Sequence, residues 1–439
     1  MMPASLPAAE SPAAALCVFL VLLVPLAAAG LAIMNAGMGR ARSAAHAMLV
    51  SLSVVSVAAL VYFICGFAFQ GIAGRGAHVV MIGGKPWSWI GGERFFFRGL
   101  PLDGSPPILI AALQMFSVGI AALVPIGSAN ERYRLRAARI STVFLAGLTY
   151  PLFAHWVWGG GWLAQLGMNY HLGRGFLDTG GAGCIHAVGG LAALTVVWVA
   201  GARPGKYTAS GLPSAIPAHN AVLILLGCFL SWVGWLGLNC AGAVLLGGAD
   251  LGRLPLVVLN TTLSAAAALV MAVFITGARF GRPDASLSAN AWIGGLVASS
   301  AAAPFLAPAA AAAIGLAAGA LVPLSIEWLE FHLGVDDPSG GISVHGVAGI
   351  WGLLAAGMLA RLPDAQAGSS AWQWLAQIVG VATLLGFVLP LSYGLHWLMN
   401  RFYPLRVSPA GEQEGMDLHE LGADAYPEFV IHSESFLPR

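Results

Sequence analysis

The chain has 439 residues, of which 58% are hydrophobic and 9% are Asp, Glu, Lys or Arg. Ordinary soluble domains carry about 25% charged residues, so this composition excludes a water-soluble globule and predicts a membrane protein with many spans. The formal net charge of +1 gives no field that would collect nucleic acid, so nucleic-acid binding is excluded as well.

Eleven segments are apolar enough and long enough to cross a bilayer, which takes about 20 residues in a helix. In chain order they are 14–38, 45–70, 108–129, 140–160, 181–201, 219–243, 254–278, 288–306, 308–327, 342–360 and 372–400. The first segment imitates a secretion signal, but no Lys or Arg precedes Arg40, so we predict a transmembrane helix there. The sequence therefore predicts an all-α polytopic membrane protein with eleven transmembrane helices.

The basic residues predict how these helices are oriented, because cytoplasmic loops of membrane proteins are enriched in Lys and Arg. With the N-terminus outside, thirteen of the twenty basic residues lie on the inner side, four of them in the short loop 132–139. Of the other seven, four lie in one long outer loop, 71–107. We predict a multi-pass protein of the cell membrane with its N-terminus outside and its C-terminus in the cytoplasm.

The C-terminal end differs in composition from the spans. Seven of the nineteen acidic residues fall within the last 39 positions. We predict a transmembrane domain at 1–400 and a cytoplasmic tail at 401–439. Charge alone favours a water-exposed, solubilising tail over a docking or regulatory segment.

Two segments, 178–194 and 337–354, match each other at a spacing of 159 residues. In both, an Asp precedes a His by eight residues, and the pattern His-x-Val-x-Gly-x-x-x-Leu follows. A weaker match relates 30–37 to 234–242. Because the first segment enters its span from outside and the second from inside, spans one to five and six to ten form an inverted repeat, with an eleventh helix added. Such repeats place the transported species near the bilayer midplane, so the pattern predicts a transport path.

The same repeat is expected to bring His186 and His345 together. A single buried His is more often a hydrogen-bonded core residue than a functional one. Two His residues at equivalent positions inside membrane spans favour a functional role, because ionisable groups are costly there. Two neighbouring imidazoles can share a proton, which makes these residues candidates for a proton relay.

Asp178 and Asp337 stand just before the helices that carry these His residues. A carboxylate at a helix start accepts hydrogen bonds from free N–H groups and favours the helix dipole. Asp178 in an outer vestibule would also lower the energy of an approaching cation. The sequence leaves the capping role and a direct role equally open, and the two roles are compatible.

With these motifs in order, the chain resembles the ammonium transporter family (Amt/MEP/Rh), and its Amt/MEP branch more than the Rh proteins. The resemblance runs through the segments 30–44, 125–135, 155–161, 178–194, 219–243, 336–352 and 415–426. It implies a homotrimer of eleven-helix subunits, each with one pore and no cofactor. It also implies that an outer vestibule recruits ammonium or methylammonium, and that ammonium loses its proton before ammonia crosses a pore lined by His186 and His345.

The resemblance also assigns candidate vestibule residues. Trp158 matches the Trp that holds the cation by cation–π attraction, and Asp178 matches the vestibule Asp. The hydroxyl that commonly binds the ion corresponds to Gly242. Asn239 belongs to the motif shared by spans one and six, and it is expected to be structural, as is Asp337.

Two stacked Phe rings usually lie above such a pore. Their positions fall on or near Ser117, with Phe116 beside it, and on Leu238. Either Phe116 and Leu238 act as apolar substitutes, or the gate and the recruitment site are altered. The sequence does not choose between these interpretations.

Three functions compete on these observations. The leading one is an ammonium transporter or channel. The second is an ammonium sensor that binds and signals but transports little, because the gate and vestibule positions are changed. The third, an enzyme with haem or metal on the intramembrane His residues, is disfavoured because no Cys, carboxylate or second His completes a ligand set. The tail segment 415–426 also permits a cytoplasmic PII-type regulatory protein as a partner.

Overall fold

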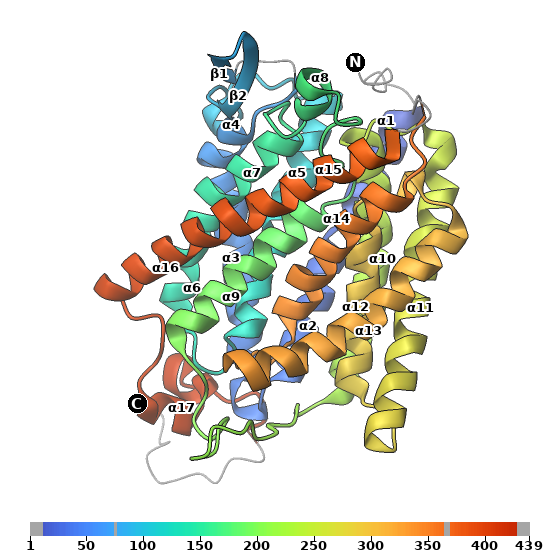
Figure 1. Ribbon diagram of the computed structural model, residues 1–439. Helices are drawn as coiled ribbons and strands as arrows, with labels where there is room; N and C mark the ends of the chain where they lie inside the picture. The colour runs from blue at the N-terminus through green and yellow to red at the C-terminus, as the bar shows by residue number, and fades with distance from the viewer. Residues whose placement is uncertain (1–11, 74–76, 364–368, 428–439) are drawn as a thin grey trace.

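The computed structural model describes residues 12–73, 77–363 and 369–427. Long helices run side by side between two ends of the molecule (Figure 1). A β-hairpin lies at one end, and the C-terminal tail packs against the other. We call these the hairpin end and the tail end.

The helices in the first half of the chain are α1 (Pro12–Leu23), α2 (Pro25–Met38), α3 (Ala44–Val61), α4 (Phe67–Gln70), α5 (Pro106–Ser128), α6 (Leu135–Phe144), α7 (Tyr150–Val157), α8 (Leu166–Tyr170) and α9 (Val188–Ala200). Those in the second half are α10 (Ala221–Leu245), α11 (Leu254–Phe280), α12 (Ala285–Ser299), α13 (Pro308–Leu333), α14 (Ala348–Leu359), α15 (Ser369–Thr383), α16 (Leu389–Phe402) and α17 (Pro409–Glu414). The π-helical segments are η2 (Tyr62–Gly66), η4 (Leu145–Thr149), η5 (Ala182–Ala187), η8 (Ile342–Val347), η9 (Leu384–Val388) and η10 (Asp417–Leu421). The short 3₁₀ turns are η1 (Ala41–Ser43), η3 (Phe95–Phe97), η6 (Leu251–Arg253) and η7 (Ala303–Phe305).

Several helix starts follow from local sequence. Asn220 and Asp284 stand before α10 and α12, and their side chains accept hydrogen bonds from backbone N–H groups three residues on, at 3.0 and 2.8 Å. Pro106 and Pro308 begin α5 and α13, where the missing N–H is not needed.

Ten helical runs in the described part of the chain are long and apolar enough to cross a membrane, and they coincide with ten of the eleven predicted spans. The prediction of an all-α polytopic membrane protein is therefore confirmed. The span predicted at 288–306 is wrong at its end, because α12 is 15 residues long and stops at Ser299. The chain then turns through η7, since Pro304 has no amide hydrogen for a continued helix, and α13 begins at Pro308.

The hairpin end carries a small sheet inside the loop predicted at 71–107. β1 (Ala77–Ile82) pairs in antiparallel fashion with β2 (Lys85–Gly91). The turn is Gly83-Gly84, and both glycines have positive φ (59° and 74°), as a two-residue hairpin turn requires. The Gly-Gly pair is a hairpin signal in the sequence, although the segment was predicted only as a loop.

Spans one and six, the pair with the weaker sequence match, pack backbone to backbone. Gly30 on α2 faces Gly227 on α10, and a methyl group on either would lie 2.5 Å from the carbonyl oxygen of the other. Small residues commonly permit such close approach between membrane helices. The contact joins the two predicted repeats along their first helices.

Part of the C-terminal tail is packed against the tail end, so the prediction of a water-exposed tail is wrong for the buried residues around Asp417. The buried carboxylate of Asp417 accepts hydrogen bonds from the N–H groups of Ala45 and His46, at 3.1 and 2.6 Å, in the first turn of α3. Glu420 accepts from the N–H of Leu135, the first residue of α6, at 2.8 Å, and it contacts the His46 ring at 2.7 Å. Two tail carboxylates thus cap two membrane helices.

We expect Asp417→Ala to lower the free energy of unfolding by about 0.5–2 kcal/mol, the usual cost of losing a helix cap. Amide hydrogen exchange at Ala45 and His46 should also become faster, because both N–H groups lose their acceptor. Asp424→Ala is the control, since the Asp424 side chain accepts from the nearby N–H of Tyr426. Equal exchange rates in the two variants would count against the cap.

Candidate functional site

The structure brings His186 and His345 together in the interior of the bundle. Their Nδ1 atoms are 3.2 Å apart, and their ring centroids are 5.2 Å apart. Each His lies in a π-helical segment at the start of its span, η5 or η8. These segments enter from opposite ends, since η5 begins near the hairpin end and η8 near the tail end.

Equivalent glycines of the two copies let these segments approach. A methyl group on Gly349 would lie 2.6 Å from the carbonyl oxygen of Ala182, and one on Gly190 would lie 2.6 Å from Cα of Gly346. Both glycines belong to the repeated pattern His-x-Val-x-Gly. The repeated pattern therefore has two effects. Its glycines allow the two segments to cross in close contact, and its His residues place the two rings next to each other.

The two rings can pass one proton between them. Because Nδ1 faces Nδ1, one ring donates the hydrogen bond and the other accepts it. Nδ1 must therefore carry a hydrogen in one ring and none in the other. Both side chains are buried, and Nε2 of His186 has no hydrogen-bond partner in the described part of the chain. This nitrogen therefore has no protein partner that would compete with a molecule or proton reaching it.

Trp235 packs flat on His186. The ring centroids are 4.9 Å apart, with 11° between the ring planes. The Trp235 side chain is fully buried, and its Nε1 finds no partner among the described residues. Together with His345 the two rings form one stack. Sequence reasoning did not assign Trp235 a role, although it stands in the motif that spans one and six share.

Trp158 and Asp178 lie on the hairpin side of the His pair. The half-buried Trp158 donates from Nε1 to the backbone carbonyl of Asp178 at 2.6 Å. The Asp178 carboxylate accepts hydrogen bonds from the N–H groups of Gly181, Gly183 and Cys184, each at 2.9 Å. Asp178 therefore caps η5 and, through its backbone, fixes the Trp158 indole.

The candidate gate positions differ in burial and bonding. Phe116 is half-buried on α5, whereas Ser117 is buried and donates to its own helix backbone at 2.8 Å. Leu238 is buried on α10. Next to it, Asn239 donates to the Thr261 hydroxyl at 3.0 Å, which ties α10 to α11. Ser117 is therefore engaged with its own helix, and Asn239 has a structural contact.

Gly242 lies against the segment that carries Asp178. A methyl group on Gly242 would lie 2.5 Å from the carbonyl oxygen of Thr179 and 3.2 Å from Cα of Gly180. Glycine at this position therefore allows α10 to pack directly on that segment.

We expect Gly242→Ser to lower the free energy of unfolding by about 1–3 kcal/mol, the usual cost of overpacking a tight contact, without restoring a vestibule hydroxyl. Thermal unfolding in detergent would measure the loss. Gly252→Ser is the matched control, because a methyl group there would meet no atom within 4 Å in the described structure. A melting temperature equal to that of the control would contradict the packing role.

Asp337 caps η8 as Asp178 caps η5. Its carboxylate accepts hydrogen bonds from the N–H of Ile342 at 2.7 Å and from the Ser339 hydroxyl at 3.3 Å. The two Asp residues of the repeat thus hold the starts of the two His-bearing segments at opposite ends of the bundle.

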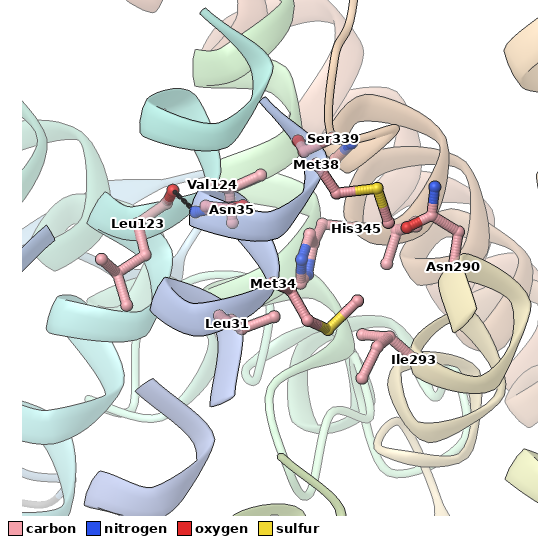
Figure 2. Close-up of a pocket in the computed structure, with 12 residues that line it drawn as sticks. Leu31, Met34, Asn35, Met38, Leu123, Val124, Asn290, Ile293, Ser339 and His345 are labelled. Atoms are coloured by element: carbon pink, nitrogen blue, oxygen red, sulfur yellow. Dashed lines mark hydrogen bonds between the residues drawn. The ribbon is translucent and has the colours of Figure 1, made fainter. Parts of the chain in front are cut away.

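A small cavity lies on the tail side of His345 (Figure 2). It leaves about 20 Å³ for the centre of a water-sized molecule, which is enough for one such molecule. Apolar side chains form most of its wall, and the polar residues in the wall are Asn35, Asn290, Ser339 and His345.

Charged side chains from three loops form a buried cluster at the tail end. Arg203 pairs with Asp336 at 2.9 Å and also with Glu131, while Arg132 lies 3.6 Å from Asp336. Burial alone would raise the pKa of Asp336, but hydrogen bonds and charges from the two Arg side chains lower it to about 2. The cluster ties the loop after α5 to the loops after α9 and before η8.

Sequence comparisons identify the family of this chain. A family model described as the Ammonium Transporter Family matches residues 14–426. The chain is 34% identical to the "Ammonium transporter Amt2" of Archaeoglobus fulgidus, over 97% of this chain and 89% of that protein. It is 30% identical to the "Ammonium transporter" of Bacillus subtilis, over 93% of this chain and 96% of that protein.

Solved structures agree with this in fold. A protein named "Sensor Amt Protein" superposes with a TM-score of 0.83 at 30% identity, over 93% of this chain and 97% of that chain. Mep2 of Candida albicans superposes with a TM-score of 0.77 at 23% identity, over 95% of this chain and 90% of that chain. The chain therefore belongs to the ammonium transporter family, and its structural relatives are Amt and Mep proteins.

Proposed function

We propose that this chain moves ammonium across a membrane as a transporter or channel. The observation that carries the proposal is the buried pair of His186 and His345 at the crossing of two oppositely directed segments. Relatives named as ammonium transporters support ammonium as the substrate, with methylammonium as a close analogue. The family is one of transporters and not of enzymes.

The proposed mechanism separates ammonium from other cations by deprotonation. Moving a bare ion into a low-dielectric interior costs tens of kcal/mol in the Born limit, whereas neutral ammonia loses only its hydrogen bonds to water. Ammonium can give up a proton, and potassium cannot. His186 and His345 would carry that proton by their own route, which makes net transport electrogenic.

Recruitment is proposed for the hairpin side, at Trp158 and Asp178. The exposed part of the indole face would hold a cation by cation–π attraction worth about 0.5–2 kcal/mol. Because the Asp178 carboxylate is committed to the start of η5, its charge would act on the cation through space. Leu238, with Phe116 beside Ser117, would supply an apolar gate below this site.

We further propose a homotrimer of subunits with an outside N-terminus, a transmembrane domain at 1–400 and a cytoplasmic tail at 401–439. The hairpin end would face outside and the tail end the cytoplasm, because the Arg-rich loops gather at the tail end. Segment 415–426 would form part of the surface that a PII-type protein contacts. Co-purification with such a protein, with nucleotide and 2-oxoglutarate present, tests this partner, and failure under every condition would argue against it.

Electrophysiology of proteoliposomes on a solid-supported membrane tests the proposed transport. Ammonium and methylammonium are expected to give a current that saturates with concentration, and potassium none, because only the first two can be deprotonated. Liposomes of the same lipid without protein are the control. A potassium current as large as the ammonium current would exclude the deprotonation mechanism, and the lack of any ammonium current would exclude transport.

The competing proposal is an ammonium sensor that transports little. The side chains Ser117 and Leu238 at the gate motivate it, together with the relative named "Sensor Amt Protein". Calorimetric titration with ammonium separates the two proposals. Binding without current would favour the sensor, whereas a robust current would exclude it as the main function.

A further inference from the structure

The polar side chain of Asn290 meets the cavity beside His345 without a partner. Asn290 lies on α12 and is 4% exposed, and its side chain makes no hydrogen bond within the described part of the chain. Figure 2 shows its amide at the cavity wall, turned toward the side on which Met38 and His345 lie. A buried amide left unpaired costs about 1–3 kcal/mol, so this position favours a small polar guest.

Each of the other polar side chains in the cavity wall has at least one polar atom already engaged. Asn35 donates to a backbone carbonyl of α5 at 3.4 Å, and Ser339 donates to a carboxylate at 3.3 Å. His345 shares its hydrogen bond with the other His of the pair. Asn290 is therefore the polar wall residue whose whole side chain is without a hydrogen-bond partner among the described residues.

The size and chemistry of the cavity fit one molecule of neutral ammonia. The room of about 20 Å³ admits one water-sized molecule. The Asn290 amide offers an oxygen that accepts from an N–H and an N–H that donates to the nitrogen lone pair. A cation would lose its hydration shell and find no carboxylate among the described residues that line the cavity. An added methyl group would have to displace apolar side chains such as Met34.

We propose that Asn290 holds neutral ammonia after it leaves the His pair, and that the cavity around Asn290 limits the size of the amine that passes. The inference rests on the proposed function, because it names a station on the same path. It adds a binding residue from α12. This helix contributes no residue to the repeated motifs or to the candidate vestibule.

Three substitutions in the full-length protein separate hydrogen bonding from size. Asn290→Leu keeps the branched shape and the number of side-chain heavy atoms but removes the polar atoms and does not enlarge the cavity. It is expected to lower the ammonium current about two- to tenfold, the equivalent of one lost hydrogen bond. Asn290→Ser replaces the amide with a shorter group that can still hydrogen-bond, a hydroxyl, and should lower the current less. Asn290→Ala enlarges the cavity, so the ratio of methylammonium current to ammonium current should rise, whereas Asn290→Leu should not raise it.

Ser288→Ala is the matched control, because Ser288 is also buried and unpartnered on α12 within the described structure but does not line the cavity. Melting temperatures in detergent show whether each variant is folded. If Asn290→Leu does not fold, the test rests on the ammonium current of Asn290→Ser and on the ratio of methylammonium current to ammonium current in Asn290→Ala. Currents and ratios like those of Ser288→Ala, in a protein that conducts ammonium, would overturn this inference alone. No ammonium current in the unmodified protein would overturn the proposed transport and this inference with it.

Discussion

Replacing His186 with alanine is expected to lower the ammonium current by at least about 100-fold, the smaller of the usual effects of removing a positioned proton carrier. The His186 ring bonds His345 at 3.2 Å and stacks on Trp235, so its loss breaks the path from ring to ring. His345→Ala should have a similar effect, because a relay of two rings needs both. Since the rings act as a unit, the double variant should be little worse than either single variant.

His396→Ala is the matched control for this experiment. His396 is also a buried His of a membrane span, but its two ring nitrogens contact the hydroxyls of Ser141 and Thr195 at 2.6 and 2.8 Å. Its loss should lower the melting temperature and leave the response to ammonium concentration unchanged. An equal loss of current in the His186 and His396 variants would indicate a packing defect, and a full current in His186→Ala would remove the relay from the mechanism.

Arg203→Met is expected to lower the free energy of unfolding by up to about 3–5 kcal/mol at neutral pH, the usual cost of removing one partner of a buried ion pair. Arg132 still faces Asp336 and Arg40 still faces Glu131 in this variant, which reduces the loss. The Arg203 guanidinium contacts both Asp336 and Glu131, and all three side chains are buried. Arg279→Met is the control, because Arg279 pairs with Glu327 at 2.7 Å but its side chain is 47% exposed. Exposed pairs contribute about 0–1 kcal/mol, so comparable losses in the two variants would contradict the role of the cluster.

The pH dependence of this loss follows from Asp336. Its pKa in the folded protein is about 2, because Arg203 and Arg132 outweigh the effect of burial. The ordinary value is about 3.9, so the stabilisation is fully present above about pH 4 and is lost as the pH falls through about 2. Without Arg203, burial would raise this pKa and the carboxyl would become neutral at a higher pH. The difference in melting temperature between the parent protein and Arg203→Met should therefore become smaller as the pH falls from 7 toward 3. A difference that stays constant over this range would contradict the lowered pKa of Asp336.

The sequence reveals the His pair and the main spans because both are local patterns. His186 and His345 belong to two copies of one motif, and the spans are runs of apolar residues that a single chain displays. Trp235 and Asn290 could not be assigned in this way. A ring stack and a cavity wall depend on how separate helices face one another, and no periodicity in one segment encodes that.

The buried charges and the tail were missed for the same physical reason. In the sequence, Arg132 and Arg203 mark only the inner face, and their pairing with Asp336 exists because three loops meet at the tail end. The acidic tail was predicted to be exposed to water because no sequence pattern marks the partners of Asp417. These partners are backbone N–H groups, which every segment of the chain carries. Only the fold shows which of those groups it meets.

The caps supplied by Asp417 and Glu420 have a consequence for the order in which the chain matures. Asp417 lies 372 residues after Ala45, and Glu420 lies 285 residues after Leu135. During synthesis the N-terminal part of a protein emerges first, so spans two and four insert while their first-turn amides still lack these carboxylates. Those helix starts are completed only when residues 417–420 have been made, so the two early spans are finished after all the later spans have been synthesised.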